Sequence, residues 1–260
     1  MAGKSPDELW NAALGELEVQ VSRANYNTWL RGTKGVSLSA DTFVVGAPSL
    51  GAAQDWAEYT SIQDGFRVDF PGTPTITDTT WKSQLDYVLP GRVYAVQKGK
   101  ERYSMTVIDY HPLEQQGIDR AAKCPEGNAQ CRQNAGIMGP GYWRHDERGA
   151  IVYATSKILQ RDVKLTSLAW EWQDMVEGHF LQVTNNADQS RTFAFVGMHA
   201  NKLYIMEGTV PKGYPEPGLF QQSLSWVDKE GKPIRYQQII YSNAYHGMGV
   251  YPVPPVGGGG

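Results

Sequence analysis

The sequence predicts an α+β protein, in which a small helix-hairpin-helix module is followed by an antiparallel-sheet α+β domain. Up to residue 31 the apolar residues recur at helical spacing. From about residue 62 short segments rich in Val, Ile, Thr and aromatic residues alternate with polar positions. Hydrophobic residues make up 41 % and charged residues 20 % of the chain, as in a folded globular protein. We expect the module at residues 1–60, the α+β domain at 61–250 and a flexible Pro/Gly tail at 251–260.

The N-terminal module is predicted to contain helices and one hairpin. Ser5 suits an N-cap, and the apolar face of the first helix recurs every fourth residue from Leu9 to Val21. Gly32 marks the end of the second helix. The expected elements are two helices within residues 5–31, a hairpin that joins 36–38 to 42–45, and a short helix at 52–59.

Most of the second domain is predicted to be strands. The alternation of polar and apolar residues favours a largely antiparallel sheet with one solvated face, and helices covering the other face. The expected helices span residues 112–123 and 217–228. The expected strands span residues 66–70, 75–81, 92–97, 102–109, 150–158, 163–172, 179–184, 192–196 and 202–210.

Five features follow one another over residues 7–59. They are Trp10, Tyr26 before Trp29-Leu30, the hairpin, Ala47-Pro48-Ser49, and Asp55-Trp56. In this order and spacing they resemble the N-terminal domain of the bacterial replication initiator DnaA. Nothing downstream contains GxxxxGK[ST], so the nucleotide-binding part of a complete initiator is absent.

The resemblance implies a docking module without chemistry of its own. Its partner would be the replicative helicase or a regulator of initiation, and the module would also self-associate. The partner-binding positions fall on Trp10, on Asn25 at the start of the second helix, and on Leu50. Trp10 adjoins the apolar face, so both an interface and a core position stay open for it. Trp29 and Trp56 are expected in the core.

Charge and hydropathy limit the partners and the compartment. The net charge of -3 and pI of about 6.0 offer no general attraction for nucleic acid, so direct DNA binding is expected to be weak or absent. No stretch is long and apolar enough for a membrane span. The opening MAGKSPDELW carries acids where a signal peptide is apolar, which favours the cytoplasm. We expect no cofactor.

Cys124 and Cys131 enclose the short polar loop CPEGNAQC. Closure into a disulfide would favour an oxidising compartment, and two reduced thiols on a surface loop are the alternative. A metal site is not expected, because the spacing is not CxxC and no second ligand pair follows.

The segment Phe66-Arg67-Val68-Asp69-Phe70-Pro71 and the closing helix near residues 218–227 carry a second resemblance. Residues 54–256 resemble exported bacterial domains of the PsbP and Mog1-like type. That resemblance implies a periplasmic location for the second domain and identifies no activity. Because the first module implies the cytoplasm, a natural or artificial fusion near residues 50–60 is one explanation.

No catalytic residue is assigned from the sequence. Asp109-Tyr110-His111 ends a predicted strand, and His145-Asp146-Glu147 lies in a predicted Gly-rich loop, so each could place an acid beside an imidazole. Direct neighbours along a strand point to opposite faces, and adjacency in sequence alone does not make a dyad. The alternating Trp170 and Trp172 are expected in the core rather than in a ligand platform. The leading hypothesis is a non-enzymatic interaction protein. The alternatives are an exported structural or ligand-binding domain and, third, a hydrolase that uses His145.

Overall fold

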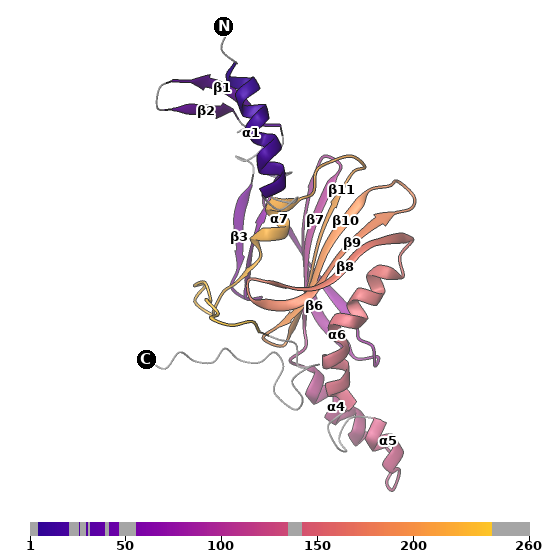
Figure 1. Cartoon of the computed structure of the whole chain (residues 1–260). Helices are drawn as coiled ribbons and strands as arrows, with labels where there is room; N and C mark the ends of the chain where they lie inside the picture. Colours follow the sequence, from indigo (N-terminus) through magenta and orange to yellow (C-terminus); the bar gives the residue numbers. More distant parts are fainter. Residues whose placement is uncertain are drawn as a thin grey trace.

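A computed structural model describes residues 5–20, 26, 30, 32–39, 42–46, 56–134 and 142–240. Within these residues a helix and a hairpin are followed by a strongly curved antiparallel sheet, with helices against one of its faces (Figure 1). The α+β class predicted from the sequence is confirmed.

The first elements are a helix and the hairpin on which it packs. Helix α1 (Pro6–Gln20) begins with a capping box: Ser5 Oγ accepts a hydrogen bond from the Glu8 amide at 3.3 Å, and Glu8 Oε2 accepts one from the Ser5 amide at 2.7 Å. Strands β1 (Lys34–Leu38) and β2 (Phe43–Gly46) pair antiparallel, and Asp7 Oδ1 accepts a hydrogen bond from the Gly35 amide at 3.2 Å. The first helix and the hairpin are thus confirmed. Most of the predicted second helix lies outside the described residues, so a complete helix-hairpin-helix module is not shown.

The second part is built on a seven-stranded sheet of order β5-β6-β7-β11-β10-β9-β8, in which all neighbouring strands are antiparallel. The alternation of polar and apolar residues correctly predicted these seven strands. They are β5 (Thr75–Lys82), β6 (Val88–Lys98), β7 (Glu101–Asp109), β8 (Val163–Gln173), β9 (Val176–Asn185), β10 (Arg191–His199) and β11 (Lys202–Val210).

Helices cover one face of this sheet. They are α4 (Leu113–Ala122) and α6 (Tyr142–Leu159), and α5 (Ala129–Asn134) lies against α4 instead of the sheet. Helix α6 packs Ala150, Ile151, Ala154 and Ile158 against apolar side chains of β9, β10 and β11. The prediction of a strand at 150–158 was therefore wrong. The buried positions follow helical spacing, and this packing overrides the strand propensity of the Ile, Val and Thr residues in the segment.

A smaller sheet covers the opposite face. Strands β3 (Ala57–Ser61), β4 (Phe66–Phe70) and β12 (Ser225–Trp226) form it in the order β12-β4-β3, and α7 (Gly218–Ser223) lies beside it. Its core includes Phe66, Phe70, Phe195 and Trp226. Both faces of the large sheet are thus covered, whereas the sequence predicted one solvated face. The central strands β10 and β11 are buried nearly throughout because they contribute to both cores.

Two boundaries predicted from the sequence also change. Residues 57–61, predicted to end a helix, form β3, which pairs with β4 across the expected boundary at residue 60. Trp56 packs edge-on against Tyr103 at a centroid distance of 5.2 Å, so it joins the core of the large sheet rather than that of the N-terminal module. The helix expected at 217–228 is the shorter α7, and the chain then turns extended into β12.

A buried carboxylate connects the small sheet to the large one through hydrogen bonds and ion pairs. Asp64, in the turn between β3 and β4, accepts hydrogen bonds from Arg92 at 2.7 and 2.5 Å and from the Tyr94 hydroxyl at 2.6 Å. Lys202 Nζ lies 3.2 Å from the same carboxylate. Burial acts to raise the pKa of Asp64, but these donors and charges outweigh it and the pKa is lowered. The network satisfies a charge that would otherwise be costly to bury.

Candidate functional site

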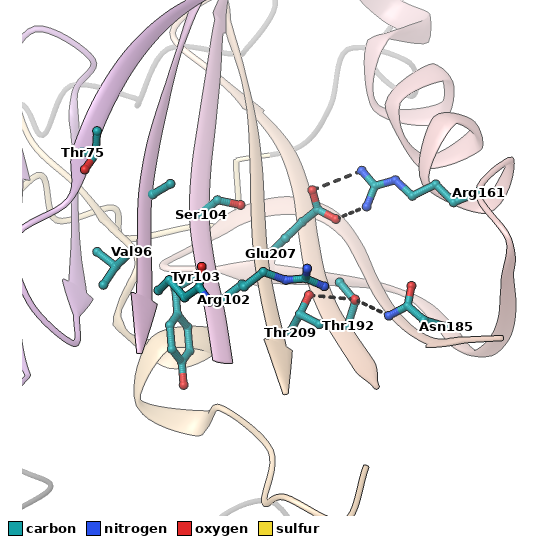
Figure 2. A pocket seen from close by; sticks show the side chains of 12 residues that line it. Thr75, Val96, Arg102, Tyr103, Ser104, Arg161, Asn185, Thr192, Glu207 and Thr209 are labelled. Atoms are coloured by element: carbon teal, nitrogen blue, oxygen red, sulfur yellow. Dashed lines mark hydrogen bonds and ion pairs between the residues drawn. The ribbon is translucent and has the colours of Figure 1, made fainter. Parts of the chain in front are cut away.

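An open polar groove of about 500 Å³ lies at one end of the large sheet. Strands β5, β6, β7, β9, β10 and β11 contribute lining side chains, and Arg161 joins them just after α6 ends at Leu159 (Figure 2). The pairing register places Glu207 and Thr209 on the same face as the core residues Leu203 and Ile205. The groove therefore occupies the helix-covered face of the sheet, at the place where α6 no longer covers it.

One ion pair forms a wall of the groove. Arg161 Nη1 lies 2.5 Å from Glu207 Oε1, and Nη2 lies 3.2 Å from Oε2, so the guanidinium donates two hydrogen bonds to the carboxylate. These bonds raise the pKa of Arg161. The pair holds Glu207 in place and leaves its charge largely compensated.

Hydroxyl and amide groups form the floor toward β9 and β10. The hydroxyl oxygens of Thr192 and Thr209 are 2.9 Å apart, and Asn185 Nδ2 donates to Thr192 Oγ1 at 3.3 Å and to Ser190 Oγ at 2.9 Å (Figure 2). Ser190 in turn donates to Asp188 Oδ1, and these hydrogen bonds lower the pKa of Asp188. The floor thus offers preoriented neutral donors and acceptors.

Arg102 supplies the remaining positive charge. Its exposed side chain extends from β7 across the groove toward β11 (Figure 2). Its guanidinium donates no hydrogen bond to a residue that the structure describes, and its charge helps to lower the pKa of Asp188. The groove therefore combines one compensated and one available guanidinium with several hydroxyls. Sequence reasoning missed it, although polar residues at 207 and 209 continue the phase of core positions 203 and 205, a pattern that can mark a lined cavity.

Of the two acid–histidine groups noted in the sequence, Asp109 and His111 are in contact, whereas Asp146 hydrogen-bonds elsewhere. His111 Nδ1 lies 2.6 Å from Asp109 Oδ1, but this is an exposed contact between residues two apart at the end of β7. His145 is exposed on α6, in what was predicted to be a loop, whereas Asp146 is buried. The Asp146 carboxylate accepts hydrogen bonds from the Ser83 hydroxyl and, at 3.1 Å, from the Gln84 amide. Asp146 thus anchors the β5–β6 turn instead of orienting an imidazole.

The other sites predicted from the sequence have mixed outcomes. Cys124 and Cys131 are joined by a disulfide bond, with sulfur atoms 2.09 Å apart. Trp10 is partly buried: its ring lies 5.9 Å from that of Phe43, and its indole N–H donates to Thr33 Oγ1 at 2.8 Å. Asn25 and Leu50 lie outside the described residues.

The placement of Trp170 and Trp172 in the core was wrong. Both lie on β8, the last strand of the sheet, with 41 % and 56 % of their surfaces exposed. Alternation correctly put them on one face, but it carries no information on whether that face is covered.

Neither a membrane-spanning helix nor a metal-binding cluster is found among the described residues. No helix among them is long and apolar enough to span a membrane. They bring together no group of three or more His, Cys, Asp or Glu side chains able to hold a metal ion.

No family model matches the chain, and no comparison supports the resemblance of residues 7–59 to the DnaA N-terminal domain. The solution structure of cyanobacterial PsbP (CyanoP) from Synechocystis sp. PCC 6803 is similar, with a TM-score of 0.33 and 12 % identity. The match covers 64 % of this chain and 86 % of that chain. PsbP is one of the two families that residues 54–256 resemble in sequence.

Proposed function

We propose that the chain is a non-enzymatic binding protein whose groove takes a small hydroxylated carboxylate, in an oxidising compartment. The observation that carries this proposal is the charge arrangement of the groove. The carboxylate of Glu207 is already held by Arg161, whereas Arg102 reaches the same cavity and interacts with Asp188 through charge alone, without a hydrogen bond to it. A ligand carboxylate would pair with Arg102.

The neutral groups favour a ligand that also carries hydroxyls. Thr192, Thr209 and Ser104 offer hydroxyl groups, and Asn185 and Gln97 offer amides. Each of these groups can both donate and accept, so together they suit a polyhydroxylated molecule better than an apolar one. The volume of about 500 Å³ accommodates a compound of the size of a sugar acid.

The disulfide supports the choice of compartment. Disulfide bonds persist in oxidising environments and are rare in the cytosol. The bond between Cys124 and Cys131 therefore favours an exported domain over the cytoplasmic location expected from the N-terminus. Fractionation of cells that express the full chain tests this point, since recovery in the cytosol with both thiols reduced would contradict it.

The binding test uses glucuronate as the probe and glucose as its uncharged counterpart. Isothermal titration of the full chain should detect glucuronate and not glucose. Arg102→Ala should weaken glucuronate binding by about tenfold or more, because a hydrogen bond to a charged group contributes about 1.5–3 kcal/mol. Arg235→Ala is the matched control, since Arg235 is exposed and does not line the groove. Equal binding of glucuronate by Arg102→Ala and Arg235→Ala would contradict the proposal. So would a wild-type chain that binds none of the carboxylates glucuronate, lactate and acetate at millimolar concentration.

A second candidate function is protein docking by the N-terminal helix and hairpin, to the replicative helicase or to an initiation regulator. The partial exposure of Trp10 favours it, because exposed indoles are frequent interface anchors. Trp10→Ala in the full chain should then abolish capture of purified replicative helicase while helicity is retained. Because Trp10 also packs on Phe43, loss of capture together with loss of helicity would instead assign it to the core.

A further inference from the structure

Strand β8 forms an unusual edge of the large sheet. It is the last strand in the sheet order, it spans Val163–Gln173 without a proline, and no strand in the part of the chain that the structure describes pairs with its outer side. Edge strands of monomeric proteins are commonly short or interrupted by Pro or inward-pointing charges, because unpaired backbone groups recruit other strands. This edge is long and has no proline, but it carries one bulge and two charged side chains, Lys164 and Glu171.

The two faces of β8 differ in chemistry. Pairing with β9 places four large apolar side chains on the helix-covered side of the sheet. They are Leu165, Leu168, Trp170 and Trp172, with exposed fractions of 43, 45, 41 and 56 %. The opposite face is polar or small, and its members are Lys164, Thr166, Ser167, Ala169 and Glu171. Any strand added at this edge must match both faces to bury the apolar row.

The bulge restricts which strand can do so. The register with β9 shifts between Leu165 and Ser167, so Thr166 is an extra residue and the alternation of faces changes phase there. A regular strand without a bulge could place its side chains on the same faces as those of β8 on one side of the bulge only. A second β8 that runs antiparallel carries the same extra residue, so its change of phase offsets that of the first strand, and the pairs outside the two bulges agree in face.

We propose that two copies of this chain pair antiparallel through β8, around a two-fold axis between Ser167 and Leu168. Lys164 then faces Glu171 of the second copy, and Leu165 faces Trp170 of the second copy. Val163 opposes Trp172, and Thr166 opposes Ala169, so these pairs agree in face. Only Ser167 and Leu168, which oppose each other twice around the axis, lie on different faces. The interface is isologous, as most dimer interfaces are.

Charge selects this register over its neighbour. A shift of each strand by one position keeps all faces matched, but it places Glu171 opposite Asp162 of the second copy. Directly opposed like charges destabilise a strand pair, and opposite charges stabilise it. Lys164 and Glu171 are both exposed and lie at the two ends of the polar row. The two-fold axis repeats their pairing, so the interface contains two such ion pairs. The proposal is independent of the groove, which β8 does not line.

A charge exchange tests the proposal on the full chain by analytical ultracentrifugation. The wild type should be a dimer. Lys164→Glu and Glu171→Lys should each weaken dimerisation by about tenfold, which corresponds to about 1.4 kcal/mol, because two attractive pairs become two repulsive ones. The double variant K164E/E171K should restore it. Within one copy the two residues are seven apart on a strand, roughly 23 Å, so rescue cannot arise inside the monomer.

Circular dichroism verifies that the exposed substitutions leave the fold intact. A monomeric wild type at high micromolar concentration would overturn the proposal. A dimer that both single variants leave unchanged, such as one formed through the N-terminal module, would also overturn it. If the double variant does not regain the dimerisation constant of the wild type, this register is excluded.

Discussion

The buried His199 should make the stability of the chain depend on pH. Its ring is 5 % exposed, it stacks on Trp226 with ring centroids 4.3 Å apart, and its Nε2 lies 2.5 Å from the Tyr236 hydroxyl oxygen. Its Nδ1 is buried without a hydrogen-bond partner among the described residues. Burial, together with the positive charge of Lys202, lowers the pKa of His199 from 6.5 to about 4.

The sign of the effect follows from proton binding. As the pH falls through 6.5 the unfolded chain takes up a proton at this position, whereas the folded chain does so only near pH 4, so acid favours unfolding. At about 1.4 kcal/mol per pH unit, the interval from 6.5 to about 4 amounts to about 3 kcal/mol. His199→Phe keeps an aromatic ring on Trp226 and removes the titrating group. Its free energy of unfolding should therefore fall less with acid than that of the wild type.

Urea unfolding followed by circular dichroism at about pH 7, 5.5 and 4.5 measures this difference. Glu147, whose pKa burial raises to about 7, acts in the opposite direction, but it is present in both proteins and cancels in the comparison. His145→Gln is the matched control, because it also replaces a histidine, at an exposed position on α6. The same loss of stability with acid in His199→Phe and in the wild type would refute the assignment.

Three further stability predictions concern the disulfide and two glycines. The double substitution of Cys124 and Cys131 by Ser should lower the free energy of unfolding by about 2–3 kcal/mol, since the short loop is no longer closed in the unfolded chain; equal urea midpoints for the oxidised and substituted proteins would argue against this. Gly178→Ala should cost about 1–3 kcal/mol, because its Cβ would lie 2.4 Å from the ring of Phe195. Gly15→Ala, where nothing lies within 4 Å of the added Cβ, should instead stabilise the chain slightly. Thermal unfolding of the two glycine variants and the wild type measures both effects.

Local patterns predicted the elements whose environment is local. The capping residue Ser5 and the hairpin turn before Phe43 define the first elements, and alternation defines seven strands of the large sheet. Helix α6 was missed because its buried positions were judged by β-propensity instead of spacing. Helix spacing at Ala150, Ala154 and Ile158 was the signal that could have found it.

The candidate site depended on tertiary arrangement and could not be predicted in the same way. Arg161 and Glu207 are 46 positions apart, and nothing local relates them. Their meeting requires the strand order of the sheet and the point at which α6 ends. The exposure of Trp172 likewise depends on β8 being last in that order. The disulfide was within reach of the sequence because both cysteines belong to one short loop.

Burial of the central strands on both faces changes what fixes their alignment. In a sheet with one solvated face, shifting the register of a strand by one residue moves its apolar side chains into water, which is unfavourable. Along β10 nearly every residue is buried, so such a slip would exchange one apolar side chain for another. Shape must then select the alignment. The ring of Phe195 lies over the facing glycines 178 and 197, a fit that only one register provides. Folding of this sheet should therefore be more sensitive to side-chain volume at these positions than to polarity.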